Sequence, residues 1–127
     1  MNDNKDKPTR LEELTRQCVE DSQRWFGDTH ASRSLPHHSL ALAGEVGEFC
    51  NIIKKIDRGS LRYEDASTRY ELMMEAADIF TYLLNIAGLI GVDLEKAYLH
   101  KRGENEKRFT AQREERESDA AAAEQPV

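Results

Sequence analysis

The spacing of apolar residues along the chain is helical almost throughout. Apolar side chains recur every three or four residues in four stretches, and no run shows the strict alternation between turn residues that is typical of a strand. The pattern predicts helices from Pro8–Thr9 to about Gly27, from His37 to Ile56, from Thr68 to about Ile90, and from Leu94 onward. The expected fold class is therefore all-α, a four-helix bundle.

Capping residues and glycines suggest where these helices begin and end. Thr9-x-x-Glu12 and Thr68-x-x-Glu71 match the capping box that opens many helices. Gly91 is expected to stop the third helix, and Gly103 suggests that the fourth is kinked or short.

The second and third helices carry most of the expected core. On the second, the inward candidates are Leu40, Ala43, Val46, Gly47, Cys50 and Ile53. On the third, apolar residues cover more than one face, so this helix should be the most buried: Leu72, Met73, Ala76, Ile79, Phe80, Leu83, Leu84, Ile86 and Ala87. One four-helix chain of this size cannot cover all of that apolar surface, which predicts at least a homodimer.

Length and composition favour a single domain over residues 1–110. The polar segment 111–127 has no aliphatic residue larger than alanine before its last position, which predicts fraying helix and then disorder. The start, Met1–Arg10, is polar and there is no uninterrupted apolar run of membrane-spanning length, so we expect a cytoplasmic protein without a membrane partner. Cys18 and Cys50 are then expected to be reduced and to pack in the core. The net charge of -6 argues against a nucleic-acid polymer as partner.

Candidate chemistry lies in two pairs of acids. Glu45 and Glu48 are three residues apart, as are Glu75 and Asp78, and this spacing places each pair on one helical face. Such pairs are usually solvated, but these four are bordered by residues that tend to be buried. Small neighbours, among them Gly44 and Gly47, would let two helix backbones approach closely.

Four inward carboxylates require a cation, because their mutual repulsion and desolvation would otherwise destabilise the fold. Magnesium fits this ligand set, since it prefers carboxylate and water oxygens and is commonly shared with substrate phosphates. Zinc would call for Cys or His ligands, which are absent at these spacings.

Three segments together resemble the MazG-like, all-α nucleoside triphosphate pyrophosphohydrolases. They are Leu42–Phe49, with an ExxE motif; Glu75–Leu83, with an ExxD motif; and Lys101-x-x-x-Asn105-x-x-Arg108-Phe109. The resemblance covers about residues 36–109. It is strongest to the short, single-domain members and to dCTP pyrophosphatase, in which a Tyr four residues after the Asp matches Tyr82.

The resemblance implies an Mg²⁺-dependent hydrolase, with Mn²⁺ as a substitute, that converts a (deoxy)nucleoside triphosphate to the monophosphate and pyrophosphate. It also implies a homodimer or homotetramer. Glu45, Glu48, Glu75 and Asp78 would hold the metal, and Glu48, with Glu45 beside it, would serve in catalysis. Lys101 and Asn105 would contact phosphate or nucleotide, and Arg108 shares their helical face. Which base and sugar are preferred stays open.

Four more residues are candidates for substrate binding. Lys54 and Lys55 end the second helix, where a cation suits the helix dipole and could equally reach a triphosphate. His38 lies seven residues before Glu45 on the same face, and Tyr82 could form a wall beside a base, although such residues more often serve the core.

Two other functions stay open at this stage. One is a catalytically idle, metal-binding helical module that acts through protein contacts. The other is a related pyrophosphohydrolase that acts on phosphoribosyl-ATP.

Overall fold

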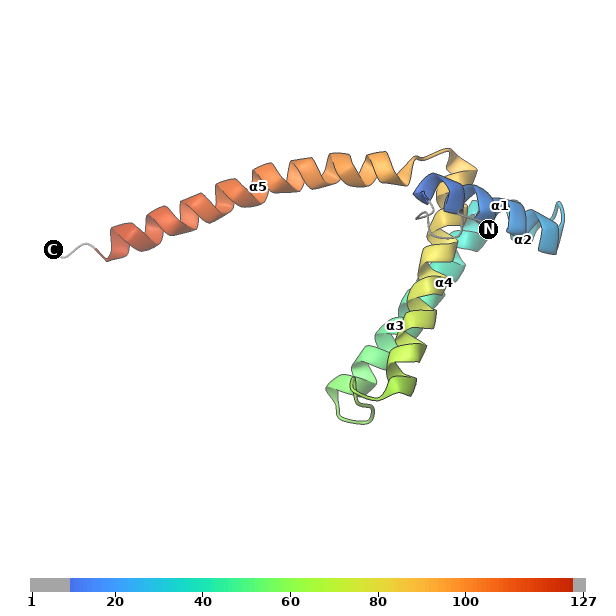
Figure 1. Cartoon of the computed structure of the whole chain (residues 1–127), viewed down its shortest axis with the longest axis horizontal. Helices are drawn as coiled ribbons and strands as arrows, with labels where there is room; N and C mark the ends of the chain where they lie inside the picture. Colours follow the sequence, from blue (N-terminus) through green and yellow to red (C-terminus); the bar gives the residue numbers. More distant parts are fainter. Residues whose placement is uncertain (1–9, 125–127) are drawn as a thin grey trace, which may run out of the picture. The chain divides into compact units, whose positions relative to one another are not determined.

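A computed structural model of the chain describes residues 10–124, and the regular structure in this range is entirely α-helical. The elements are α1 (Leu11–Phe26), α2 (His30–Arg33), α3 (Leu35–Asp57), α4 (Ala66–Ile90) and α5 (Leu94–Ala123) (Figure 1). The predicted all-α class is confirmed. The chain divides into two compact units, one ending at Val92 and one beginning at Asp93.

The first unit is built on the pair α3 and α4, which lie side by side (Figure 1). A short connection joins them, so they run antiparallel. Their contact buries Ile52 of α3 and Leu72 of α4, and Leu84 and Ala87 extend the buried set along α4. α4 contributes the most buried residues of the helices in this unit, as predicted.

α1 packs against α4 at one very close approach. A Cβ added at Gly88 would lie well inside van der Waals contact of Val19 Cγ2, and 3.4 Å from Thr15 Cγ2. Gly88 is therefore a notch that lets the two helices meet. Around Gly44 and Gly47, by contrast, an added Cβ would meet no atom within 4 Å, so the expected close approach at these two glycines is not seen.

Several helix boundaries differ from those predicted. Thr9 lies outside the described residues, and α1 instead begins after Arg10, whose backbone N–H donates to Glu13 Oε2 at 3.2 Å. α3 begins at Leu35, with the Ser34 hydroxyl accepting from the His37 N–H at 3.2 Å. α4 begins at Ala66 with Asp65 as its N-cap, so the capping box at Thr68 was wrong; Thr68 is buried inside the helix.

α2 was not predicted, because its sequence is polar. Its turn is held by the hydroxyl of Ser32, which donates to the carbonyl of Gly27 at 2.6 Å and accepts from the Thr29 N–H at 3.2 Å. Ser32 is 2% exposed.

The expected core of α3 and α4 was too large. Residues predicted to point inward are exposed in the single chain, Leu40 by 77% and Met73 by 57%. Cys50 is exposed and Cys18 is half-buried, so the prediction that both cysteines lie in the core was wrong for Cys50. The α3 residues that are buried are His38 and Ile52.

The second unit consists of α5. The Asp93 side chain caps it by accepting from the Lys96 N–H at 3.1 Å. The helix runs for 30 residues through Gly103, so the predicted kink or early end there is absent. For segment 111–127 fraying helix and then disorder were predicted; α5 continues through this segment to Ala123, and residues 125–127 lie outside the described residues. Alanines and the pair Arg113 Nε–Glu117 Oε1, 3.6 Å apart, favour helix without burial.

Within the described residues, α4 is also the one helix long and apolar enough to cross a membrane by length and composition, with a mean hydropathy of 1.3. Core helices of soluble proteins meet the same criterion. α4 carries Glu75 and Asp78 along its length and is paired with α3, so composition alone does not assign it to a membrane.

Candidate metal site and adjoining cleft

Three carboxylates converge where α3 and α4 pair. Single oxygens of Glu45, Glu48 and Glu75 all lie within 4.8 Å of one another. Glu45 and Glu48 come from one face of α3, because residues three apart in a helix are neighbours. Glu75 reaches them from α4. The structure thus brings together three of the four predicted metal ligands, and we call them the acidic trio.

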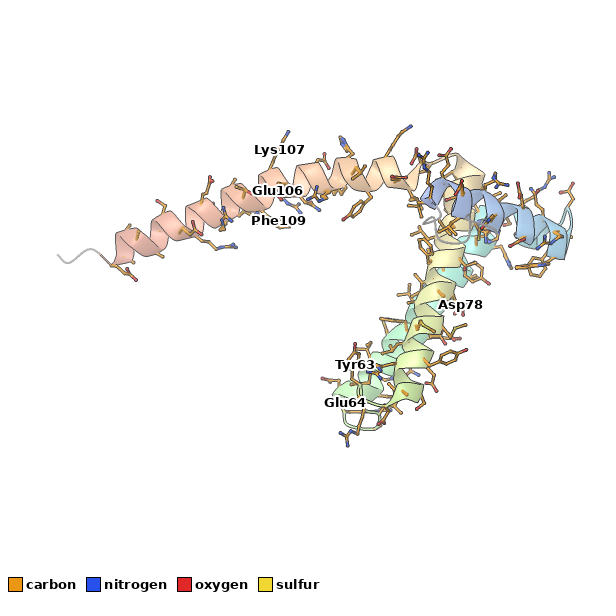
Figure 2. The ribbon with its side chains drawn as sticks, in the orientation of Figure 1. Tyr63, Glu64, Asp78, Glu106, Lys107 and Phe109 are labelled. Atoms are coloured by element: carbon orange, nitrogen blue, oxygen red, sulfur yellow. The ribbon has the colours of Figure 1, made fainter. Side chains whose placement is uncertain are left out.

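Asp78, the fourth, lies beside the trio and not within it. Its side chain is carried by α4 (Figure 2), three residues after Glu75 in the sequence. Its charge is near enough to contribute to the raised pKa of Glu75. Asp78 is exposed and lines the cleft described below, where it is available to a ligand or to a second cation.

The Glu75 carboxyl is the most perturbed group of the trio. Its Oε2 atom is buried and makes no hydrogen bond to any described residue. Burial raises the pKa of Glu75, the charge of Glu48 raises it further, and the nearby Glu45 carboxylate adds to the same shift. A buried carboxylate oxygen without a partner, facing two other carboxylates, is the arrangement that a bound cation would satisfy.

The chemistry of the trio fits a hard divalent cation. All its donors are carboxylate oxygens, which Mg²⁺ and Mn²⁺ prefer. Glu48 is exposed, so the site is open to solvent and to a phosphate on one side. Glu45 and Glu75 are half-buried and would be the more rigid ligands.

A cleft of about 690 Å³ adjoins the trio and is lined by α1, α3 and α4. Glu45 belongs to both the cleft and the trio. The other walls are largely aromatic and apolar, from Trp25, Phe26, Phe80, Tyr82 and Leu84. This size and lining are typical of small-molecule sites.

His38 is the most unusual polar group of the cleft. It is 2% exposed, yet neither ring nitrogen makes a hydrogen bond to a described residue. Its ring centroid lies 6.1 Å from that of Tyr82 and 5.6 Å from that of His37. Two of the predicted substrate-binding residues, His38 and Tyr82, therefore lie together in the cleft that Glu45 also lines. Their roles stay predictions.

Two other polar groups of the cleft, Asn85 and Cys18, are hydrogen-bonded to one carbonyl. Asn85 is buried and donates from Nδ2 to the Thr81 carbonyl at 3.3 Å, the same carbonyl that accepts from Cys18 Sγ at 3.3 Å. Burial raises the pKa of Cys18, and the nearby charge of Asp21 raises it further, so this thiol is protonated at neutral pH and is not a nucleophile.

The two lysines at the end of α3 are not equivalent. Lys55 is seven residues from Glu48 and so lies on the same helical face, about 10 Å along the axis. Lys54 is six residues away and is turned off that face. Lys55 is half-buried and Lys54 is exposed, and Lys55 is thus the better placed of the two to meet a ligand held by the trio.

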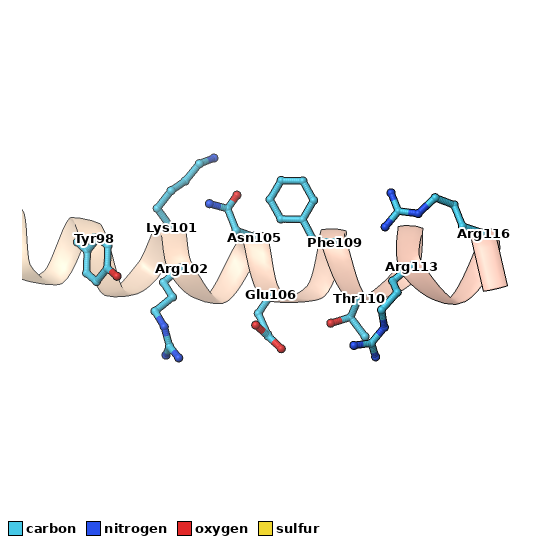
Figure 3. Close-up of a pocket in the computed structure, with 9 residues that line it drawn as sticks. All are labelled: Tyr98, Lys101, Arg102, Asn105, Glu106, Phe109, Thr110, Arg113 and Arg116. Atoms are coloured by element: carbon cyan, nitrogen blue, oxygen red, sulfur yellow. The ribbon is translucent and has the colours of Figure 1, made fainter. Parts of the chain in front are cut away.

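The three predicted residues of α5 lie close together along that helix. Lys101 pairs with Glu104 at 3.2 Å, and Arg108 donates to Asn105 Oδ1 at 3.2 Å. Figure 3 shows Lys101, Asn105 and Phe109 projecting from one edge of the helix and Arg102 and Glu106 from the other. They belong to an open surface on α5 that carries four basic side chains, Lys101, Arg102, Arg113 and Arg116, and one acidic side chain, Glu106.

The sequence analysis missed several residues of the cleft. Trp25, Phe26, His37 and Asn85 line it, and Trp25 is 65% exposed. The spacing of apolar residues predicted the α1 helix, but it did not indicate which face of α1 would contact α4. No protein-family model matches the chain, and no curated protein gave a significant match.

Proposed function

We propose that the chain is an Mg²⁺-dependent nucleoside triphosphate pyrophosphohydrolase, which releases a nucleoside monophosphate and pyrophosphate. The observation that carries the proposal is the acidic trio, with the buried, unpartnered Oε2 of Glu75, set against a cleft that shares Glu45. The MazG-like motifs point in the same direction and supply the expectation of a four-helix bundle acting in the cytoplasm on the nucleotide pool.

In this function Glu45, Glu48 and Glu75 hold the metal, and Asp78 completes or extends the site. Bound Mg²⁺ supplies positive charge that neutralises phosphate oxygens and acidifies water. Mn²⁺, with the same preference for oxygen ligands, can substitute.

The carboxylates also handle the proton of the reaction. A water oxygen bonds to phosphorus at the α–β anhydride, the bridging P–O bond breaks, and pyrophosphate and monophosphate separate. Glu48, the exposed member of the trio, accepts the proton that the water loses, with Glu45 beside it to hold its orientation.

The cleft is the place for the nucleoside. Tyr82 and the aromatic residues of α1 offer flat apolar surfaces, and His38 offers a ring nitrogen that is not hydrogen-bonded to any residue in the described range. Lys55, with Lys54 as a weaker candidate, is proposed to contact the phosphates. For Lys101, Asn105 and Arg108 of α5, phosphate contact stays a prediction from the motif resemblance.

The test is a panel of nucleoside triphosphates assayed with Mg²⁺ for their products. We expect monophosphate and pyrophosphate in equal amounts, loss of turnover in EDTA, and loss in Glu75→Gln. Glu64→Gln is the matched control, because Glu64 is an exposed acid between α3 and α4 that is paired with Arg62 and is not in the trio. Stepwise release of orthophosphate, or full activity of Glu75→Gln, would exclude the proposal.

A further inference from the structure

The cleft beside the acidic trio carries acids and aromatic rings on its walls but, among the described residues, no lysine or arginine. Its three carboxylates are those of Asp21, Glu45 and Asp78. Its larger aromatic side chains come from α1 and α4: Trp25, Phe26, Phe80 and Tyr82. Low-dielectric walls focus the field of the charges between them, so this cleft favours a ligand group that carries positive charge.

Asp21 differs from the other two acids of the cleft in its place on the fold. Glu45 is a member of the trio and Asp78 lies beside it, so a bound cation would neutralise their charges. Asp21 stands on α1, whereas the trio stands on α3 and α4. Its charge acts inside the cleft, since it contributes to the raised pKa of the Cys18 thiol on the same wall. Asp21 is therefore the carboxylate left for the base of a nucleotide whose phosphates are held at the metal.

Asp21 and Trp25 form one corner of the cleft that already accepts a cation. They are four residues apart and so share a face of α1. The guanidinium group of Arg24 pairs with Asp21, and its Cζ atom lies 5.7 Å from the centroid of the Trp25 ring. A cation over the face of a tryptophan is stabilised by the charge distribution of the ring. Arg24 is 69% exposed and does not line the cleft, so the cleft side of this corner is open to a ligand.

His38 gives an independent indication that the cleft holds a ligand. It is 2% exposed, and neither ring nitrogen is hydrogen-bonded to a described residue. Buried polar groups are nearly always hydrogen-bonded, so a ligand that offers a donor or an acceptor would satisfy this ring. The ligand that matches all of these features is flat and aromatic, has a hydrogen-bonding edge and carries positive charge.

We propose that the cleft selects nucleotides whose base has been made cationic by alkylation of a ring nitrogen over nucleotides with a neutral base. The inference rests on the proposed function for the place of the phosphates. Asp21 faces the charge of the base, Trp25 stacks on its ring, and His38 hydrogen-bonds to its edge. Asp21 and Trp25 thus determine specificity and take no part in the hydrolysis.

The test compares two methylated nucleosides of the same size. At neutral pH 1-methyladenosine is a cation, whereas its isomer N6-methyladenosine is neutral. Trp25 is the single tryptophan of the chain, so quenching of its fluorescence reports binding at this wall. Titration of each nucleoside into the full chain in EDTA needs neither metal nor hydrolysis. We expect the cationic isomer to bind about tenfold more tightly than the neutral one.

Asp21→Asn removes the charge and keeps the shape, and it should reduce the preference to about threefold or less. Glu20→Gln is the matched control. Glu20 is the neighbouring acid of α1, is paired with Arg16 and does not line the cleft, so its variant loses the same charge and should keep the tenfold preference. Circular dichroism verifies that both variants are folded. Equal affinity of the wild type for the two nucleosides, no quenching by either, an unchanged preference in Asp21→Asn or an equal loss in Glu20→Gln would overturn the inference.

The selectivity and the proposed hydrolysis fail separately. Release of pyrophosphate from ordinary nucleoside triphosphates, without a difference between the two nucleosides, would exclude only the selectivity. A tenfold preference in a chain that hydrolyses no triphosphate would exclude only the hydrolysis and leave a binding site for cationic bases. If both hold, kcat/KM for the triphosphate of 1-methyladenosine should exceed that for the triphosphate of its isomer by a similar factor.

Discussion

Replacing Glu75 by glutamine tests the acidic trio without reference to any substrate. In the cation-free protein, Oε2 of Glu75 is buried without a partner and the carboxylates of Glu45 and Glu48 lie within 4.8 Å. Glutamine keeps the shape, removes one negative charge, and provides an amide that can donate to the neighbouring carboxylates. We expect the cation-free Glu75→Gln protein to be as stable as the wild type at neutral pH, or more stable.

The stability of the cation-free wild type relative to that of Glu75→Gln should fall as pH rises. The pKa of Glu75 is raised above its ordinary value of 4.5, so the folded chain holds this proton more tightly than the unfolded chain. The stability that the protonated carboxyl contributes is present below pH 4.5 and is lost as pH rises through the raised pKa. The wild type should therefore lose stability relative to Glu75→Gln over that interval, and only in the absence of a cation.

Magnesium should reverse the order of the two proteins. At a hundredfold excess over its dissociation constant, Mg²⁺ stabilises the wild type by about 2.7 kcal/mol. For a chain of this length that is a rise in Tm of roughly 10 °C. If the variant binds a hundredfold more weakly, the same concentration stabilises it by only about 0.4 kcal/mol, or roughly 2 °C.

Thermal unfolding followed by circular dichroism, with EDTA and with a series of Mg²⁺ concentrations, measures all of these effects. Glu64→Gln, outside the trio, should show the wild-type response to both pH and Mg²⁺. The reasoning is refuted if Glu75→Gln is less stable than the wild type in EDTA and still gains the full shift with Mg²⁺.

Three further predictions follow from other parts of the structure. Gly88→Ala should destabilise the protein by about 1–3 kcal/mol in urea denaturation, because the added methyl group overlaps Val19. Adding Val19→Ala should recover part of this loss. Wild-type stability of the single variant would contradict the close approach at Gly88. His38→Leu removes two buried nitrogens that are not hydrogen-bonded to any described residue. The ligand-free variant should be as stable as the wild type or up to about 1–3 kcal/mol more stable, and its KM for the nucleotide should rise. A marked loss of stability would show that His38 supports the fold. Gly103→Ala should gain about 1 kcal/mol of helix stability because nothing surrounds that position, and no increase in helical ellipticity or Tm would indicate that α5 is interrupted there.

The parts of the fold that follow from local rules could be predicted from the sequence. Helix identity follows from periodicity, and the pairing of Glu45 with Glu48 follows from helical geometry alone. The helix in segment 111–127 was harder to predict. A segment without large apolar residues gains nothing from burial, yet its alanines and ion pairs still favour helix. Periodicity also identifies an apolar face without saying what covers it, and this is why Met73 was expected in the core.

The cleft could not be predicted, because it depends on how α1 crosses α4. That crossing is fixed by Gly88, one of seven glycines in the chain, and nothing in the sequence distinguishes it from the others.

The candidate cation site and one wall of the cleft are built by different helices of the first unit. The acids stand on α3 and α4, whereas one whole wall of the cleft, including Gln17, Asp21 and Trp25, comes from α1. α1 contacts α4 through Thr15 and Val19 at the notch and through the Cys18–Thr81 hydrogen bond, so substitutions elsewhere on α1 can reshape that wall without moving the carboxylates. A lineage could therefore change the ligand it recognises by altering one helix, while the cation site stays as it was.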